Sequence, residues 1–227
     1  MKPEQPGRWR TLKYALGGLL LLTLLLGALA YGYRSTFNTR FAAMEQLPVS
    51  ACQPDRNGRW QVPSSLGEYP PLLARLLQHM EGETVDVQLV RRFLLTPAES
   101  ESEIPGDGRF RWREMALQLQ YSQYRRLELF INHVFMGEAR PGCSIYGLKA
   151  ASQFYFNRRP ENLSPAAVAL LSVQVRAPKY FDPVQFPDRI RVLRDQRLQW
   201  AREQRLITPD EYQQALAEPL PTRTHAP

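Results

Sequence analysis

The sequence predicts a mostly α-helical protein, in which an apolar N-terminal helix precedes a single helical domain. Residues 14–33 form an apolar run without a charged side chain. Farther along, apolar residues recur at spacings of three and four, for example at Leu127, Phe130 and Ile131, which is the period of an amphipathic helix. The 227 residues, 44% of them hydrophobic, suffice for one domain and an anchor.

The charge of the chain points to a membrane rather than to nucleic acid. The net charge is +7. Residues 1–13 form a basic tail, in which four cations stand against the single anion Glu4: Lys2, Arg8, Arg10 and Lys13. The tail therefore carries a charge of 4 − 1 = +3, and the rest of the chain carries +4. A charge of +4 on the rest of the chain is weak support for binding to nucleic acid, so we expect no nucleic-acid partner. It fits better with a protein that lies beside an anionic membrane and binds anionic lipid substrates.

The apolar run 14–33 predicts a transmembrane helix. About 20 residues cross a hydrocarbon core of about 30 Å, and Tyr14, Tyr31 and Tyr33 lie at the ends, as interfacial aromatics do. The rival is a cleaved signal peptide, whose apolar part is shorter, roughly 7–15 residues. We therefore expect a single-pass protein of the cytoplasmic (inner) membrane, with a cytoplasmic N-terminus and a periplasmic main domain.

Residues 34–70 are expected to form an extracytoplasmic linker and irregular lobe, because prolines and an Asn57-Gly58 turn interrupt them. This compartment is oxidising, so the sequence favours a disulfide between Cys52 and Cys143 over two buried thiols. A short helix is predicted over 71–80, with Pro71 at its first position.

The stretch 125–157 reads as two amphipathic helices joined by a loop that glycines and prolines break. Within it, LELFINHVFMG and YGLKAASQFYFN resemble the core of the peptidoglycan glycosyltransferases (glycosyltransferase family fifty-one, the biosynthetic transglycosylases). The residues that carry the match are Glu128, Asn132, Gly137, Tyr146 and Gly147. The resemblance implies a lysozyme-like α-helical domain over 71–216 with a reduced N-terminal lobe, in a truncated and degenerate member of that family.

A second segment, GETVDVQLVRRFLLT at 82–96, resembles the family's GGSTITQQLVKNLFLT. By this resemblance Thr84, Gln88 and Arg91 bind the substrate. Arg91 stands where the family has lysine, and it keeps the charge while adding a planar donor fork that suits phosphate. Gln88 and Arg91 are three residues apart and share a helical face.

The same segment also departs from the family. Glu83 and Asp86 replace its Ser and Thr, and we interpret both as part of a solvated helix face. Farther upstream the family carries its catalytic glutamate in an EDxxFxxHxG motif, as a general base. Between Arg34 and Gly82 this chain has no such motif, and its glutamates there are Glu45, Glu68 and Glu81. No catalytic residue is therefore assigned.

Residues 97–109 read as an exposed loop, after which RFRWREMALQLQYSQ begins a helix. Its Arg111 and Arg113 resemble the family's RKxxE motif, which implies substrate phosphate contacts. Glu114 is out of register with the glutamate that helps to hold a divalent metal in the family. The residues themselves predict no metal site and no cofactor. A divalent metal is implied only by the resemblance to the family.

Three C-terminal helices are expected. The first has Ser164 as N-cap and Pro165 at its first position. The second, over 187–206, is rich in arginine, which usually indicates a solvated face. The third opens with a capping box formed by Thr208 and Glu211. Residues 217–227 are expected to be a disordered tail.

Two functions remain open. The first is a membrane-anchored pseudoenzyme of peptidoglycan biosynthesis, which binds lipid-linked precursor, nascent glycan or a cell-wall synthase and is catalytically impaired because the ED motif is missing. The alternative is an active transglycosylase that polymerises lipid-linked disaccharide into glycan strands. Glycan hydrolysis on a lysozyme-like fold is a weaker third option, because that chemistry usually needs two carboxylates and no convincing pair is identified.

Overall fold

The computed structural model describes residues 7–46, 64–80, 84–96, 99, 107–140 and 143–221. It divides into two compact units, Met1–Met44 and Glu45–Pro227. Each unit is described by itself below. The expected Cys52–Cys143 pairing lies outside the described residues, because Cys52 and the side chain of Cys143 are not among them.

The first unit is one helix, α1 (Gly7–Met44). It continues well past the end of the apolar run, so residues 34–44 are helical and not part of an irregular lobe as expected. The leucines of the apolar run are exposed along it. Among the described residues, no helix has both the length and the apolarity that a membrane crossing requires.

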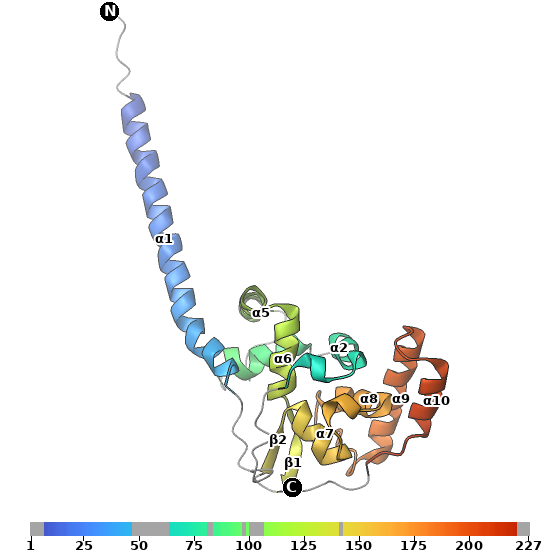
Figure 1. The fold of residues 1–227 in the computed structure, drawn as a ribbon. Coiled ribbons are helices and arrows are strands. Elements are labelled where there is room, and N and C mark those ends of the chain that lie inside the picture. Colours follow the sequence, from blue (N-terminus) through green and yellow to red (C-terminus); the bar gives the residue numbers. More distant parts are fainter. Residues whose placement is uncertain are drawn as a thin grey trace, which may run out of the picture. The chain divides into compact units, whose positions relative to one another are not determined.

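The second unit is mostly helical, as predicted. Its N-terminal half contains η1 (Leu66–Glu68), α2 (Pro71–Gln78), α3 (Val85–Leu89), the π-helical turn η2 (Val90–Leu94), α5 (Gly108–Gln120) and α6 (Gln123–His133). Its C-terminal half contains β1 (Phe135–Arg140), β2 (Cys143–Tyr146), α7 (Leu148–Phe156), η3 (Pro160–Asn162), α8 (Pro165–Gln174), α9 (Pro187–Glu203) and α10 (Pro209–Ala217). Figure 1 shows their arrangement.

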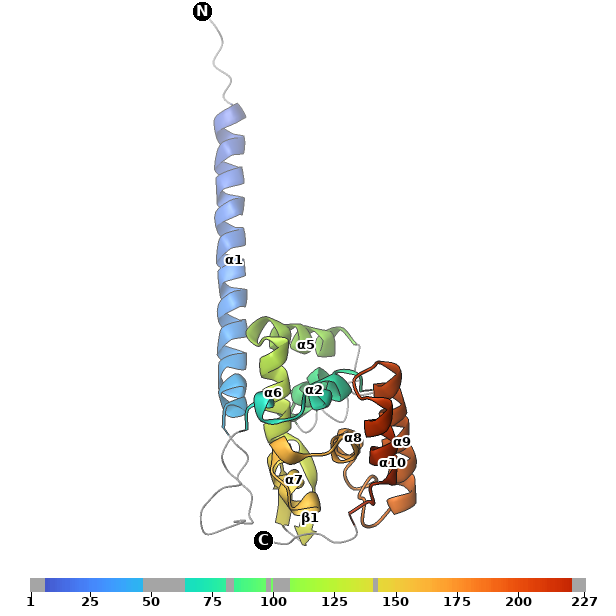
Figure 2. The same ribbon diagram turned by 45° about the vertical axis from the view of Figure 1, so that its right-hand side comes forward.

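Helix α8 forms the centre of the C-terminal half. Nearly all of its residues are buried, since small and aliphatic side chains follow one another from Ala166 to Val173. Helices α2, α9 and α10 pack against it (Figure 2). The predicted caps are confirmed: Ser164 accepts a hydrogen bond from the Ala167 backbone N–H, and Thr208 and Glu211 form a reciprocal capping box.

The expected loop between the two core helices is instead a β-hairpin. Helix α6 ends at His133, and β1 pairs antiparallel with β2 in a register that sets Phe135 opposite Tyr146. Val134 and Phe135 continue the three- and four-residue spacing of Leu127, Phe130 and Ile131, which in the sequence alone is typical of one helix. Val134 is extended, however, and its carbonyl accepts a hydrogen bond from Gly147 N–H at 2.8 Å. Pairing between strands thus overrides the helical periodicity.

Two further expectations at the C-terminus are corrected. The arginines of α9 do not all lie on a solvated face: Arg194 is 3% exposed and donates to the carbonyls of Leu216 and Glu218, and Arg197 is buried and donates to the His79 carbonyl. Both satisfy carbonyls at helix ends. Part of the expected disordered tail is packed on the domain, because Leu220 is buried in a cluster with Leu170 and Ile190; residues 222–227 lie outside the described residues.

Gly147 is the closest backbone contact between α6 and the segment that follows the hairpin. Its φ is +83°, a conformation that favours glycine. A Cβ at this position would lie 3.1 Å from the Asn132 carbonyl oxygen and 3.2 Å from that of Ile131. The position therefore requires glycine for both its backbone angle and its contact.

We predict that Gly147→Ala destabilises the domain by about 1–3 kcal/mol, because it combines strain at positive φ with the two carbonyl contacts. Gly108→Ala is the matched control, since Gly108 begins α5 and a Cβ there meets nothing within 4 Å. Urea unfolding measures both variants. Equal stability of the two would contradict this account of Gly147.

Candidate functional site

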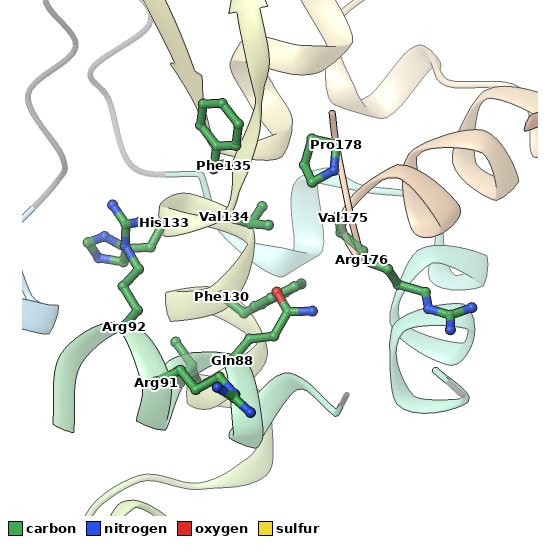
Figure 3. A pocket seen from close by; sticks show the side chains of 11 residues that line it. Gln88, Arg91, Arg92, Phe130, His133, Val134, Phe135, Val175, Arg176 and Pro178 are labelled. Atoms are coloured by element: carbon green, nitrogen blue, oxygen red, sulfur yellow. The ribbon is translucent and has the colours of Figure 1, made fainter. Parts of the chain in front are cut away.

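A cavity of about 320 Å³ lies between α3, η2, the end of α6 and the turn after α8. Figure 3 shows its side chains. The cationic groups come from η2 and from the turn after α8, and the apolar groups come from α3, α6, β1 and the same turn. The lining comprises Gln88, Leu89, Arg91, Arg92, Phe130, His133, Val134, Phe135, Val175, Arg176 and Pro178.

The π-helical turn brings two consecutive arginines to this cavity. In η2 the Leu95 backbone N–H donates to the Val90 carbonyl at 3.1 Å, five residues back instead of four. The wider turn changes the helical positions of the residues after Val90. Gln88 and Arg91 line the same cavity, as their spacing predicted, and Arg92 joins them.

Gln88 has an unsatisfied donor at the cavity. Its Nε2 is buried, and among the described residues it finds no hydrogen-bond partner. Its amide reaches toward the centre of the cavity in Figure 3. A buried amide without a partner costs free energy, on the order of 1–3 kcal/mol. An acceptor on a bound molecule would remove that cost.

Aromatic rings hold the two arginines of η2. The guanidinium of Arg91 lies 6.0 Å from the centre of the Phe110 ring, and that of Arg92 lies 4.9 Å from the Tyr146 ring and 5.6 Å from the Phe93 ring. Such contacts stabilise a cation without neutralising its charge. Both guanidinium groups therefore keep their positive charge at the cavity.

His133 is buried at the cavity and packs edge-on against Phe93, with ring centres 4.9 Å apart. Arg92 also lines the cavity and is labelled with His133 in Figure 3. Arg176 approaches from the turn after α8 and adds a third cation to the lining. The site therefore combines three guanidinium groups, one amide and one imidazole.

Carboxylates are absent from the lining of this cavity as far as the structure describes it. Two glutamates elsewhere are engaged in the fold. Glu68 accepts from the Ser65 backbone N–H at 2.8 Å and pairs with Lys149 at 3.3 Å. Glu128 accepts from Ser65 Oγ at 3.0 Å and from Leu66 N–H at 3.1 Å. Neither carboxylate faces the cavity.

The residues of the expected core motif prove to be structural. Together with Glu128, Asn132 fastens the segment at Ser64 to α6: it accepts from the Ser64 backbone N–H and donates to the Ser64 carbonyl, both at 2.9 Å. Gly137, at φ +125°, leaves room for Tyr155, whose hydroxyl donates to the Met136 carbonyl at 3.0 Å. Burial raises the pKa of Tyr155, so the donor stays protonated.

The other expected substrate-binding residues are not brought to the cavity. Thr84 is the N-cap of α3 and lines a separate cavity of about 110 Å³. Arg111 is exposed on α5. Arg113 donates to the Leu94 carbonyl at 3.1 Å and pairs with Glu99 at 2.6 Å, so it holds the end of η2.

Asp86 is not part of a solvated face, contrary to expectation. It forms an ion pair with Arg126 of α6 at 2.8 Å and accepts from Gln118 of α5 at 3.0 Å. Its side chain is mostly buried because α3 packs against both helices there. Arg126 offsets its negative charge. Glu83 lies outside the described residues.

Sequence reasoning missed Arg92, His133 and Arg176 as lining residues. The doublet Arg91-Arg92 could have indicated a second cation, and His133 follows Phe130 by three residues on α6. The described part of the chain contains no group of three or more His, Cys, Asp or Glu residues that could hold a metal ion.

The comparisons with known proteins agree with the motif in α6 and α7. The transglycosylase family profile matches residues 76–202, more than half of the chain. The chain belongs to the transglycosylase family. Its resemblance to that family, inferred from the sequence, is thereby confirmed.

This transglycosylase-family chain is similar to much longer proteins. It is 31% identical to penicillin-binding protein 1B of Vibrio cholerae over 139 residues, 61% of this chain and 17% of the relative. It is 28% identical to penicillin-binding protein 1A of Aquifex aeolicus over 141 residues, 61% of this chain and 18% of the relative. A crystal structure of penicillin-binding protein 1A from Haemophilus influenzae matches 70% of this chain and 18% of that one, with 21% identity and a TM-score of 0.46. The chain thus spans less than a fifth of these relatives.

Glu114 yields a prediction on pH. Partial burial raises the pKa of this carboxyl, the neighbouring Asp86 raises it further, and Arg111 lowers it. Folding therefore favours the protonated form, and stability falls as pH rises from the ordinary carboxyl pKa through the raised one. Glu114→Gln should raise the melting temperature at pH 7 and change it less at pH 4.

The control for this prediction is Glu138→Gln, on the exposed part of β1. It should shift the melting temperature little at either pH. If Glu114→Gln lowered the melting temperature at pH 7, the ionised carboxylate would be stabilising, and the effect of burial would have the wrong sign.

Proposed function

We propose that this transglycosylase-family protein takes part in bacterial cell-wall assembly, binds lipid-linked peptidoglycan precursor or nascent glycan, and is impaired in glycosyl transfer. One observation carries the proposal: the cavity holds Gln88 and three arginines, and its described lining contains no carboxylate. The site has groups that suit an anionic glycan precursor, and among the described residues it has no carboxylate that would activate a sugar hydroxyl.

Binding is supported by the chemistry of the lining. Guanidinium groups form forked hydrogen bonds with phosphate oxygens, so Arg91 and Arg92 suit a diphosphate-linked sugar. The partnerless Gln88 amide donor suits a sugar or phosphate oxygen. Phe135, which is partly exposed, supplies apolar surface on which the ring of a sugar can rest.

Impairment is supported by the missing base. Removing the proton from an attacking hydroxyl by a positioned base contributes typically 10²–10⁴ to the rate. The described lining offers only His133 as a group of that kind, and it is buried against Phe93. An active transglycosylase is the other candidate, and catalysis by a base outside the described residues would be its mechanism.

Membrane attachment is part of the proposal. The uncharged run 14–33 and the exposure of its leucines along α1, such as Leu19 and Leu29, support an N-terminal anchor. The basic tail before it supports a cytoplasmic N-terminus, with the domain in the periplasm. A cell-wall synthase in the same membrane is a fitting partner.

The test is binding of purified lipid-linked disaccharide to the detergent-solubilised full chain. Gln88→Ala/Arg91→Ala should weaken binding by at least about tenfold, because charge-assisted hydrogen bonds are lost. Gln199→Ala/Arg202→Ala is the matched control, the same residue pair at the same spacing on the exposed face of α9.

Equal affinity of the wild type and the cavity variant would contradict the proposed site. An equal loss in the α9 control would also contradict it, because nonspecific charge would then explain the binding. No binding at all would leave a protein partner as the function of this domain.

A further inference from the structure

The turn after α8 leads into α9 and exposes two aromatic side chains. Tyr180 is 66% exposed, and Phe186 is 38% exposed. Arg189 of α9 contacts both residues: its Nη1 donates to the Tyr180 carbonyl at 3.3 Å, and its guanidinium lies 5.2 Å from the centre of the Phe186 ring. We call Tyr180, Phe186 and Arg189 the aromatic platform.

The backbone beneath the aromatic platform is held in place from the inside. Phe181 packs against the buried cluster that α8 and α9 share. The Asp182 carboxylate accepts from the backbone N–H of Val184 at 2.8 Å and from that of Gln185 at 2.9 Å. The Asp182 carbonyl accepts from the Phe186 N–H at 2.9 Å. The platform is therefore preorganised, which lowers the entropic cost of binding a ligand there.

The aromatic platform continues the wall of the cavity. Arg176 and Pro178 line the cavity from the same turn (Figure 3), and the Tyr180 N–H donates to the Ala177 carbonyl at 2.9 Å. The cavity volume of about 320 Å³ lies at the lower end of the range for small-molecule sites, about 300–1,000 Å³. A glycan strand longer than the sugars bound in the cavity must therefore continue over the surface of the domain.

The charge of the platform region differs from that of the cavity. Residues 179–189 carry two cations, Lys179 and Arg189, and two anions, Asp182 and Asp188, so their net charge is zero. Diphosphates and anionic bilayers favour a cationic surface. Exposed rings with a few polar groups around them suit a ligand of low charge density, such as a strand of sugars, whose C–H faces pack on aromatic rings.

We propose that the aromatic platform binds the sugars of a glycan strand outside the cavity, with sugar rings packed on Tyr180 and Phe186 and with Arg189 donating to sugar hydroxyls. The proposal rests on the proposed function of the cavity and gives the bound strand a direction, along the turn after α8 toward α9. A protein partner fits this surface less well. Two aromatic side chains supply at most about 500 Å², whereas a stable protein interface buries about 800 Å² on each partner.

The experiment compares two probes on the detergent-solubilised full chain. Lipid-linked disaccharide reports on the cavity, and lipid-free, peptide-free glycan strands of several disaccharides report on the aromatic platform. The platform variant is Tyr180→Ala/Phe186→Ala, and Leu119→Ala/Tyr124→Ala, at exposed positions of α5 and α6, is the matched control. Thermal melts verify folding. Tyr180→Ala alone is the second variant, because Tyr180 has the more exposed of the two rings.

We expect the platform variant to bind glycan strands about tenfold more weakly, because the ring contacts are lost. Its affinity for lipid-linked disaccharide should fall less than its affinity for the strands. Gln88→Ala/Arg91→Ala should show the opposite order, since the cavity contacts the diphosphate. Tyr180→Phe should bind strands like the wild type, because it keeps the ring, and the control should bind both probes like the wild type.

Equal affinity of the wild type and the platform variant for glycan strands would overturn the inference. An equal loss in the α5–α6 control would overturn it too, because nonspecific apolar contact would then explain the binding. A wild type that binds lipid-linked disaccharide but no strands would refute the platform and leave the cavity as proposed. Strand binding that the platform variant loses, without disaccharide binding by the wild type, would support the platform and refute the cavity.

Discussion

The contact between Gly147 and the last turn of α6 is the constraint on which the site depends. A side chain at Gly147 would crowd two α6 carbonyls, and the φ of this residue is positive, so glycine is strongly favoured where the chain returns from the hairpin. The same turn of α6 carries Asn132, which fastens Ser64, and His133, which lines the cavity. One close approach therefore fixes the N-terminal segment, the hairpin and one wall of the cavity.

The positive charge of the cavity lining arises because nearby carboxylates form ion pairs and hydrogen bonds elsewhere in the fold. Asp86 is only two residues from Gln88, yet its charge is offset by Arg126. Glu128 and Glu68 hold backbone at the start of the domain. Arginines then dominate the described lining of the cavity, where Arg91 and Arg92 lie over aromatic rings. Such a lining suits an anion and, among the described residues, contains no carboxylate for proton abstraction.

The sequence predicted what depends on local chemistry and on the family motif. Helix caps at Ser164 and Thr208 were predictable, because capping involves neighbours three residues apart. The spacing of Gln88 and Arg91 also predicted a shared helical face, and both residues line one cavity. These features need only local spacing and residue type.

What the sequence could not predict depends on tertiary contacts. The hairpin brings together Gly147 and Val134, which form a backbone hydrogen bond although they are distant in the sequence. Hydrophobic periodicity reports only on neighbouring residues and does not predict such a contact. Arg92 reaches the cavity through a π-helical turn, which has no simple sequence signature. Arg194 and Arg197 looked solvated, but they are buried because carbonyls at distant helix ends accept from them.

The central claim is that the cavity binds precursor without polymerising it. The most direct measurement is glycan-chain formation from purified lipid-linked disaccharide by the full chain in vesicles. We expect no glycan above the level given by Gln88→Ala/Arg91→Ala. Polymer formed by the wild type and lost in that variant would show that this cavity catalyses transfer, and would contradict the account.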